Sequence, residues 1–185
     1  MQTTVTSNRP QFWRALFPSP VGDLQLLADQ NFLWMVAFGQ NFESVLARII
    51  PRDCEVLQNS NAILTETQKQ LNEYFLGLRK QFSLPTSLQG SEFQKAAWNS
   101  LMQIPYGSTF SYSRQAEMLN NPGAARAVGT ANKMNPLCIV IPCHRVVAKS
   151  GRLSGYAGGE AAKEWLLKLE YSPKRHICRL TSPQR

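Results

Sequence analysis

Prolines and glycines stand at short intervals along this chain and limit the length of each regular element. The 185 residues include 11 of each, and neither residue is favoured inside a helix or a strand. Pro18 and Gly22 interrupt one apolar region, Pro51 ends a second and Pro105 ends a third. The chain is therefore expected to fold from short elements. No segment offers the roughly 20 consecutive apolar residues of a membrane-spanning helix.

The first 90 residues are expected to form a small unit of strands and helices. Apolar runs predict short strands at 13–17, 24–28 and 32–38. One helix is predicted over 42–50 and a second from Thr65 onward, where Leu71, Phe75 and Leu78 recur at helical spacing. Residues 79–90 predict a connector. No recognisable catalytic motif lies in this half.

The second half predicts a series of short helices, over 91–104, 111–119 and 122–134. Ser91 and Gln94 fit a capping box at the start of the first. Asn121 is expected to cap the third, and Pro122 suits its first position because the missing N–H would be unpaired there. Two short helices joined by a tight turn, as the second and third are, resemble a helix-turn-helix.

The helix over 122–134 is built from small residues around one long cation, Arg126. The small residues are Gly123, Ala124, Ala125, Ala127, Gly129, Thr130 and Ala131. Small side chains let a helix approach a partner closely, and one long cation could reach into that partner. The same composition also suits a helix that packs tightly on its neighbour with Arg126 on the solvated edge. The pattern alone leaves both interpretations open.

The run LCIVIPCHRVV at 137–147 carries a nucleophile beside a base. Its apolar part predicts a buried strand that Pro142 ends, which places Cys143 and His144 at the break. The thiolate is the reactive form of cysteine, and a nearby base or positive charge lowers the pKa of the thiol. Adjacent residues of a strand point to opposite faces, so a link between the two would need a water or a turn. A buried structural cysteine beside an incidental histidine is the alternative.

A glycine-rich loop and a last helix follow. The loop over 151–159 carries Tyr156 and lacks the spacing of phosphate-binding loops, so it predicts the wall of a pocket. The helix over 160–170 contains Glu164, whereas its main apolar stripe lies largely on the other side. Periodicity alone therefore predicts a solvated Glu164.

The charge balance and the spacing of the cysteines limit the classes of protein to which this chain can belong. The chain has 20 Lys and Arg against 12 acidic residues, a net charge of +8. That balance suits a polyanion such as nucleic acid, although it also serves simple solubility. The four cysteines are scattered without a paired spacing, which gives little support to a disulfide framework or a zinc cluster. The N-terminus lacks the apolar core of a signal peptide. A reducing cytosol is therefore the expected compartment.

Taken together, these segments resemble the O6-alkylguanine-DNA alkyltransferase family (methylated-DNA–protein-cysteine S-methyltransferases) in its bacterial single-protein form. The resemblance is carried by IPCHRVV (141–147), NPGAARAVGTAN (121–132), the pair Asn135–Pro136, GYAGG (155–159) and KEWLL (163–167). The likeness implies an α/β (α+β) fold in three parts. Residues 1–90 would form a ribonuclease-H-like small β-sheet with helices. Residues 91–171 would form a mostly helical DNA-binding and alkyl-transfer domain with the helix-turn-helix, and 172–185 a flexible basic tail.

The resemblance also implies a set of catalytic roles. Cys143 would accept the alkyl group, His144 would act as its base through a bridging water, and Glu164 would orient His144. Asn135 would hold the turn that bears the active-site segment. Tyr112 would donate a hydrogen bond to the departing guanine and help to rotate the nucleotide out of the stack.

Further residues are implied in DNA binding and in the substrate pocket. Arg126 would fill the vacated place in the base stack, with further contacts from Tyr112, Ser113, Asn121, Ala124 and Ala127. The substrate pocket would be lined by Tyr156, Ala157, Val146 and Arg145. Some relatives have serine where this chain has Ala157, so a backbone N–H must serve at guanine O6.

The implied activity is irreversible, single-turnover transfer of an alkyl group from O6-alkylguanine in duplex DNA, with O4-alkylthymine as a further candidate substrate. The protein would bind the minor groove as a monomer in the bacterial cytosol or nucleoid, with no metal, no cofactor and no membrane association. Two other classes explain part of the sequence. A Cys-His-Glu hydrolase or acyl transferase leaves Arg126 and the charge unexplained, and a non-catalytic DNA-binding module leaves Cys143 unexplained.

Overall fold

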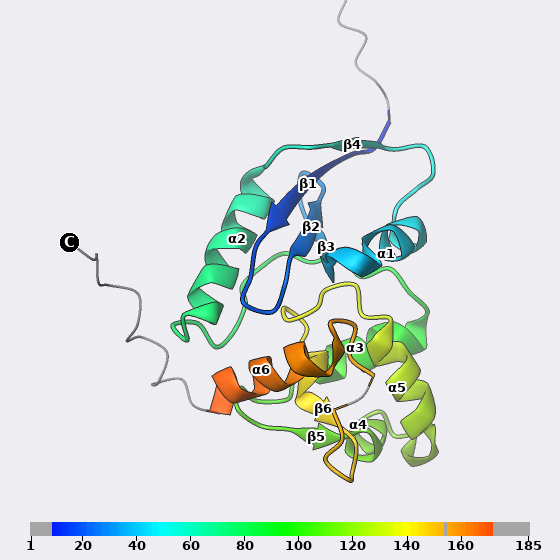
Figure 1. The fold of residues 1–185 in the computed structure, drawn as a ribbon. Helices are drawn as coiled ribbons and strands as arrows, with labels where there is room; N and C mark the ends of the chain where they lie inside the picture. The colour runs from blue at the N-terminus through cyan, green and yellow to red at the C-terminus, as the bar shows by residue number, and fades with distance from the viewer. Residues whose placement is uncertain (1–8, 154, 172–185) are drawn as a thin grey trace, which may run out of the picture.

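The computed structural model describes residues 9–153 and 155–171 and divides them between a sheet layer and a group of helices (Figure 1). The sheet and its two helices come from the first half of the chain, and the second group comes from the second half. This architecture confirms the predicted α+β fold. Within the described residues, no helix combines the length and apolar character needed to span a bilayer.

Four strands form the sheet in the order β3-β2-β1-β4. They are β1 (Gln11–Phe17), β2 (Leu24–Ala28), β3 (Leu33–Phe38) and β4 (Glu55–Leu57). The first three pair antiparallel, and β4 runs parallel to β1. The three predicted strands are confirmed. The sequence does not predict β4, because three residues are too few to show an alternating pattern.

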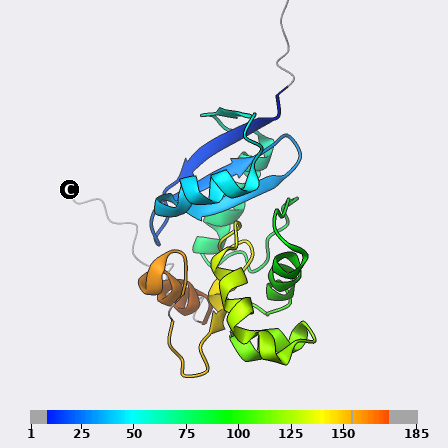
Figure 2. The same cartoon turned by 90° about the vertical axis from the view of Figure 1, so that its right-hand side faces the viewer.

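The two faces of the sheet bury different partners. Helix α1 (Phe42–Ile49) packs with the face that bears Leu27 and Met35. Helix α2 (Ala62–Phe75) packs with the opposite face, which bears Leu26 and Val36, because successive strand residues point to opposite sides. In Figure 1 the sheet lies between α2 and α1, and in Figure 2 α1 lies in front of the sheet. Helix α2 begins three residues before the predicted Thr65, because the Asn61 side chain caps it by accepting from the Leu64 N–H at 2.9 Å.

The described part of the second half contains four α-helices and a short two-stranded sheet. The helices are α3 (Glu92–Leu101), α4 (Tyr112–Met118), α5 (Ala125–Lys133) and α6 (Gly159–Tyr171), and the strands are β5 (Phe110–Ser111) and β6 (Val146–Val147). The predicted capping box of Ser91 and Gln94 is present at the start of α3. The indole of Trp98 donates to the Ala131 carbonyl at 2.8 Å and joins α3 to α5. On α4, the Gln115 side chain donates to the Ala97 carbonyl of α3 at 2.9 Å and accepts from Asn132 of α5 at 2.7 Å, so the three helices form one group.

The turn between α4 and α5 differs in detail from the prediction. Asn120 takes a left-handed conformation with φ of 54°, which asparagine tolerates better than most residues. A 3-10 turn, η2 (Pro122–Ala124), then precedes α5. The predicted capping role of Asn121 is wrong, since its side chain makes no capping hydrogen bond. Its backbone carbonyl instead accepts from the Ala124 N–H at 2.9 Å.

The apolar segment over 137–142 is buried but forms a turn, so the predicted strand is wrong. The Ile141 N–H donates to the Leu137 carbonyl at 2.8 Å, and Ile139 has a φ of 73°. Leu137 forms an isolated bridge to Val36 of β3, which ties the turn to the sheet. A second 3-10 turn, η3 (Cys143–Arg145), follows directly. Apolar composition predicted the burial correctly, whereas the backbone path is set by these long-range contacts.

One hydrophobic core runs through both halves of the protein. It includes Leu26 of the sheet, Tyr74 of α2, Leu137 and Cys143 of the turn, and Leu166 of α6. The turn that carries Cys143 is therefore packed between the sheet and the helical group. Burial on this scale fixes the position of the nucleophile by packing as well as by hydrogen bonds.

Candidate active site

Cys143 begins η3 at the end of a tightly held turn. Its side chain lies in the common core, and its N–H donates to the Ile141 carbonyl at 2.8 Å. The buried Asn135 side chain donates to the same carbonyl at 2.8 Å and accepts from the Leu137 N–H at 3.0 Å. These bonds join both arms of the turn and agree with the role expected for Asn135. The turn is therefore preorganised to present the thiol in one position.

His144 follows Cys143 in η3 and is fully buried. Its Nε2 atom lies 2.9 Å from Oε1 of Glu170 on α6. The predicted partner, Glu164, is wrong: its carboxylate pairs with Lys168 at 2.7 Å, and its side chain is 53% exposed. Glu164 and Glu170 lie six residues apart on α6, which places them on different faces of the helix. The buried face of α6 carries Glu170.

Glu170 is the acceptor at the centre of a buried polar cluster. Arg145 donates from Nε to Oε2 at 2.9 Å and from Nη2 to Oε1 at 3.0 Å, and the Gly107 N–H donates to Oε2 at 3.2 Å. Burial alone would raise the pKa of the Glu170 carboxyl. Hydrogen bonds and charge from His144 and Arg145 outweigh burial and hold that pKa at about 2. Glu170 is therefore a carboxylate at neutral pH, and the Arg145 guanidinium balances its charge.

This carboxylate sets the tautomer of His144. An ionised carboxylate only accepts hydrogen bonds, so the imidazole proton lies on Nε2 and Nδ1 is left as the basic nitrogen. Burial lowers the pKa of His144 despite the opposing effect of Glu170, which keeps the ring neutral near pH 7. Nδ1 is buried and has no hydrogen-bond partner within residues 9–153 and 155–171. His144 thus offers a neutral imidazole whose basic nitrogen is free to take a proton.

Three side chains favour the thiolate form of Cys143. A hydrogen bond from the Cys138 thiol is the largest influence that lowers the pKa of Cys143, and it outweighs burial, which acts in the opposite direction. Asn135 and the positive charge of Lys163 act in the same sense as Cys138. Lys163 is buried on α6 and donates to the Val146 carbonyl at 2.7 Å. The site therefore combines a fixed thiol, a neutral base and a local positive charge.

The glycine-rich segment over 155–159 covers the site, and the first half of the chain holds it. The Ala157 carbonyl accepts from Asn41 at 2.9 Å and from Gln40 at 3.2 Å. The Phe38 ring packs edge-to-face on Tyr156, with ring centroids 5.6 Å apart. The Tyr156 ring also lies 6.3 Å from the His144 ring, centroid to centroid. Among the described residues, its buried hydroxyl has no hydrogen-bond partner.

A cavity of about 350 Å³ and another of about 280 Å³ flank the turn that carries Cys143. Tyr156 and Ala157 line the smaller cavity together with Cys138. Arg145 lines the larger cavity, so its predicted place beside Tyr156 and Ala157 is wrong. Its guanidinium is instead held by Glu170 and by the Ile104 carbonyl at 2.7 Å.

The residues expected to contact DNA lie on α4, α5 and the turn between them. Ser113, Asn121, Arg126 and Ala127 are exposed, and Ala124 is half-buried. Tyr112 is half-buried at the first position of α4. A Cβ built on Gly155 would lie 3.7 Å from the Tyr112 hydroxyl, so this tyrosine reaches from α4 to the loop that covers the site. Burial and the nearby Cys143 raise its pKa, which keeps the phenol protonated.

Comparisons with known proteins identify the family. Residues 13–88 match the model of the 6-O-methylguanine DNA methyltransferase ribonuclease-like domain, and 92–172 match the DNA-binding domain of the same family. The chain is 43% identical over 158 residues to the methylated-DNA–protein-cysteine methyltransferase of Methanosarcina acetivorans, covering 85% of this chain and 97% of that protein. The chain belongs to the methylated-DNA–protein-cysteine methyltransferase family.

Other members of the family are similar in sequence and in structure. The protein of the same name from Mycobacterium leprae is 49% identical over 153 residues, covering 82% of this chain and 88% of that one. The crystal structure of Mycobacterium tuberculosis O6-methylguanine methyltransferase superposes with a TM-score of 0.76 at 37% identity, covering 87% of this chain and 93% of that one. A structure of the M. tuberculosis protein in complex with DNA gives a TM-score of 0.74 at 37% identity, covering 86% and 93%.

The sequence did not single out several residues that complete this methyltransferase site. They are Phe38, Asn41, Tyr74, Cys138, Lys163 and Glu170. For two of them the signal is present in the sequence. Lys163 and Glu170 lie seven residues apart, so they share one face of α6 with the apolar Leu166, whereas Glu164 lies off that face. The others act across long sequence separations, and periodicity carries no information about such contacts.

We expect replacement of Cys138 by alanine to raise the pKa of Cys143, since it removes the largest influence that lowers it. The rate of Cys143 carbamidomethylation by iodoacetamide should then fall severalfold at pH 7 and recover at high pH. Peptide mapping separates this reaction from labelling elsewhere. Cys138→Ser keeps a hydrogen-bond donor and should stay close to wild type. An unchanged pH profile in the alanine variant would show that Cys138 does not tune the thiol.

Proposed function

We propose that this methyltransferase repairs O6-alkylguanine in duplex DNA by moving the alkyl group onto Cys143. The observation that carries this assignment is the buried chain Glu170–His144 beside a thiol whose pKa is lowered. Such an arrangement removes a proton from sulfur and leaves a nucleophile in a water-poor site. The remaining distance between sulfur and imidazole would be bridged by one water that donates to Nδ1 of His144.

The transfer step balances without a cofactor. The proton of Cys143 passes through the water to Nδ1 of His144, and Glu170 stabilises the imidazolium that forms. The thiolate attacks the alkyl carbon, so a sulfur–carbon bond forms while the carbon–O6 bond breaks. The electron pair stays on guanine O6, and the base takes up a proton to become ordinary guanine. The product thioether has no acidic proton and is a poor leaving group, so each protein molecule acts once.

The attacked carbon cannot be reached inside the base stack, so the nucleotide must rotate out of the duplex. We assign this task to the face formed by α4 and α5. The exposed, small-residue side of α5 would lie in the minor groove, with Arg126 inserted in place of the extruded base. Tyr112 would donate to the guanine as it leaves. Ser113, Asn121, Ala124 and Ala127 would contact the backbone around it.

The pocket for the extruded guanine would lie beneath the loop over 155–159. Tyr156 would stack along the base, and the backbone N–H of Ala157 would donate to O6. The Val146 side chain is fully buried and its carbonyl is already engaged by Lys163, so Val146 would shape the floor of the pocket. O4-alkylthymine presents a similar alkylated oxygen and is the further candidate substrate.

The protein is proposed to act as a monomer in the cytoplasm, where DNA is the substrate and a reducing environment preserves the thiol. We place the domain boundary at residues 90 and 91, between the segments that match the two family models. The basic tail predicted over 172–185 lies outside the described residues.

Mass spectrometry of the intact protein tests the proposed function. The protein is incubated with a duplex that carries one O6-methylguanine, and we expect a gain of one CH₂ that maps to the peptide containing Cys143. The Cys143→Ala variant should gain no mass and leave the lesion intact, although it should still bind the duplex. With the lesion in large excess, repair should stop at one equivalent. Repeated turnover, or an adduct confined to another residue, would refute the assignment.

A further inference from the structure

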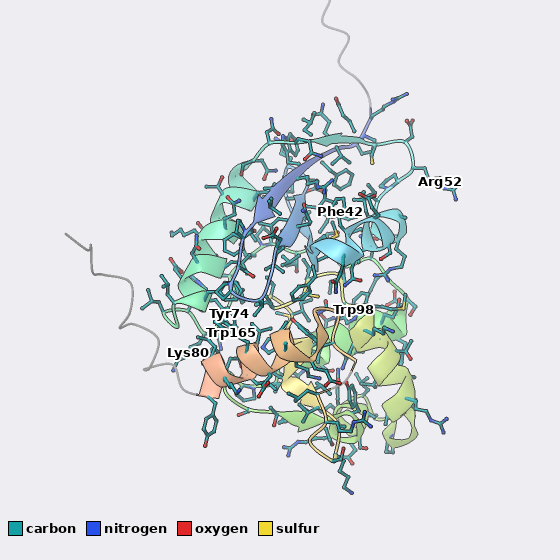
Figure 3. All side chains as sticks on the ribbon, in the orientation of Figure 1. Phe42, Arg52, Tyr74, Lys80, Trp98 and Trp165 are labelled. Carbon is teal, nitrogen blue, oxygen red and sulfur yellow. The ribbon has the colours of Figure 1, made fainter. Side chains whose placement is uncertain are left out.

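The first half of the chain contributes a hydroxyl group directly to the catalytic carboxylate. Tyr74 lies in the last turn of α2, where that helix meets α6, and is labelled in Figure 3. Its side chain is fully buried, and its hydroxyl lies 2.8 Å from Oε1 of Glu170. The same hydroxyl lies 3.5 Å from Nε2 of His144. Tyr74 therefore contacts both members of the proton-accepting pair.

The direction of this hydrogen bond is fixed by chemistry. Glu170 is ionised and can only accept, so Tyr74 must be the donor. Burial raises the pKa of Tyr74 well above its usual range, and the Glu170 charge acts in the same sense, so the phenol keeps its proton. The oxygen that accepts from Tyr74 is also the one that lies against His144 Nε2. Arg145 Nη2 donates to this oxygen as well, so three donors share its negative charge.

We propose that Tyr74 is a positioning residue for alkyl transfer, which holds Glu170 in line with His144 and moderates the pull of the carboxylate on the imidazole proton. The proposal rests on the function proposed above. It also gives the sheet-bearing half a part in the chemistry: the half without a catalytic motif supplies a donor to the proton relay. Packing alone would be satisfied by phenylalanine, whose ring could make the same contacts with Phe82, 5.4 Å away between ring centroids.

The other charged and titratable groups around this pair come from several elements. Arg145 of η3 donates twice to Glu170, and Lys163 of α6 places a positive charge near His144. Tyr106 precedes β5, and burial and the negative charge of Glu170 raise the pKa of its phenol. Tyr156 of the covering loop and Cys143 complete the set. Among the described residues, Tyr74 is the phenol that the structure shows donating to the carboxylate, so its loss should leave the other contacts in place.

The test is the pH dependence of alkyl transfer by Tyr74→Phe. Without the phenol, Oε1 should attract the imidazole proton more strongly, and a larger fraction of His144 should be protonated in mild acid. A protonated His144 cannot act as a base. We expect the single-turnover rate at pH 6 to fall about threefold or more relative to wild type, with little change at pH 8.5. Tyr106→Phe is the matched control, because its hydroxyl lies in the same region without a hydrogen bond to Glu170.

A ¹⁵N NMR titration of the His144 ring provides a second readout that does not depend on DNA. Wild type should show a proton on Nε2, and Tyr74→Phe should move the protonation midpoint to higher pH. Equal loss of rate at all pH values, with an unmoved titration, would reduce Tyr74 to a structural role and overturn the proposal. If wild type forms no Cys143 adduct, the proposed function fails. The NMR comparison would still decide whether Tyr74 changes the protonation midpoint of the His144 imidazole.

Discussion

Replacing Glu170 with glutamine is expected to slow alkyl transfer by about a hundredfold or more, whereas the same change at Glu164 should leave the rate unchanged. Glutamine has nearly the same shape but no charge to stabilise the imidazolium that forms on His144. It can also present an NH₂ group to Nε2, which would favour the wrong tautomer of the ring. Single-turnover rates on an O6-methylguanine duplex measure the effect.

The same substitution should also destabilise the fold, because it leaves the Arg145 guanidinium buried without a counter-charge. Removing one partner of a buried ion pair costs about 3–5 kcal/mol. Urea denaturation monitored by circular dichroism measures this cost, and rates should be compared at a temperature where both variants are folded. Glu164→Gln is the matched control, since its exposed pair with Lys168 is worth little. Equal rates in the two variants would refute the assignment of Glu170 to the relay.

Replacing Gly158 with alanine is expected to displace the loop that covers the site and to reduce transfer at least tenfold. A Cβ at this position would clash with Cζ of the Phe38 ring and would lie 2.6 Å from its Cε1 and Cε2 atoms, inside contact distance. The ring is buried and packs on Tyr156, so it has little room to move. Overpacking of this kind costs about 1–3 kcal/mol. Moving the loop would also carry Tyr156 and Ala157 away from the pocket.

The reaction with free O6-benzylguanine separates loop displacement from weakened DNA binding, because the free base needs no extrusion from a duplex. Gly158→Ala should be slow with this base as well as with DNA. Gly39→Ala is the control, since a Cβ there would meet its nearest neighbour at an ordinary 3.8 Å. Shortening the clashing side chain in a Phe38→Leu, Gly158→Ala double variant should recover much of the rate. Failure of this rescue, with the fold intact, would show that the Phe38 contact does not position the loop.

The sequence predicted the local parts of this site and missed the parts that depend on tertiary contacts. Cys143 and His144 are adjacent, and Asn135 lies only six residues from the carbonyl it binds at Ile141, so a continuous motif contains them. The carboxylate lies 26 residues from His144 along the chain. The KEWLL motif implied Glu164 as the partner of His144, whereas the buried face of α6 continues to Glu170. Periodicity had indicated a solvated Glu164, and on this point periodicity was right.

The fold shows the same division between local and long-range information. Capping at Ser91 and the first three strands depend on neighbouring residues, and both predictions are confirmed. The segment over 137–142 has the composition of a strand, yet the bridge from Leu137 to Val36 and the bonds of Asn135 bend it into a turn. A single sequence carries no record of those partners. Strand-like composition therefore predicted that this segment is buried, but it did not predict its backbone conformation.

The continuous core has a consequence for how such a protein tolerates change. Cys143 shares packing neighbours with residues of the sheet, of α2 and of α6, so no boundary of loosely packed atoms isolates the nucleophile from the rest of the molecule. A cavity left by a smaller side chain in the sheet would therefore open in the same core that holds the thiol. Packing against the sheet thus helps to align the reactive sulfur. Substitutions in the sheet are therefore constrained by the reaction that the other half of the protein carries out.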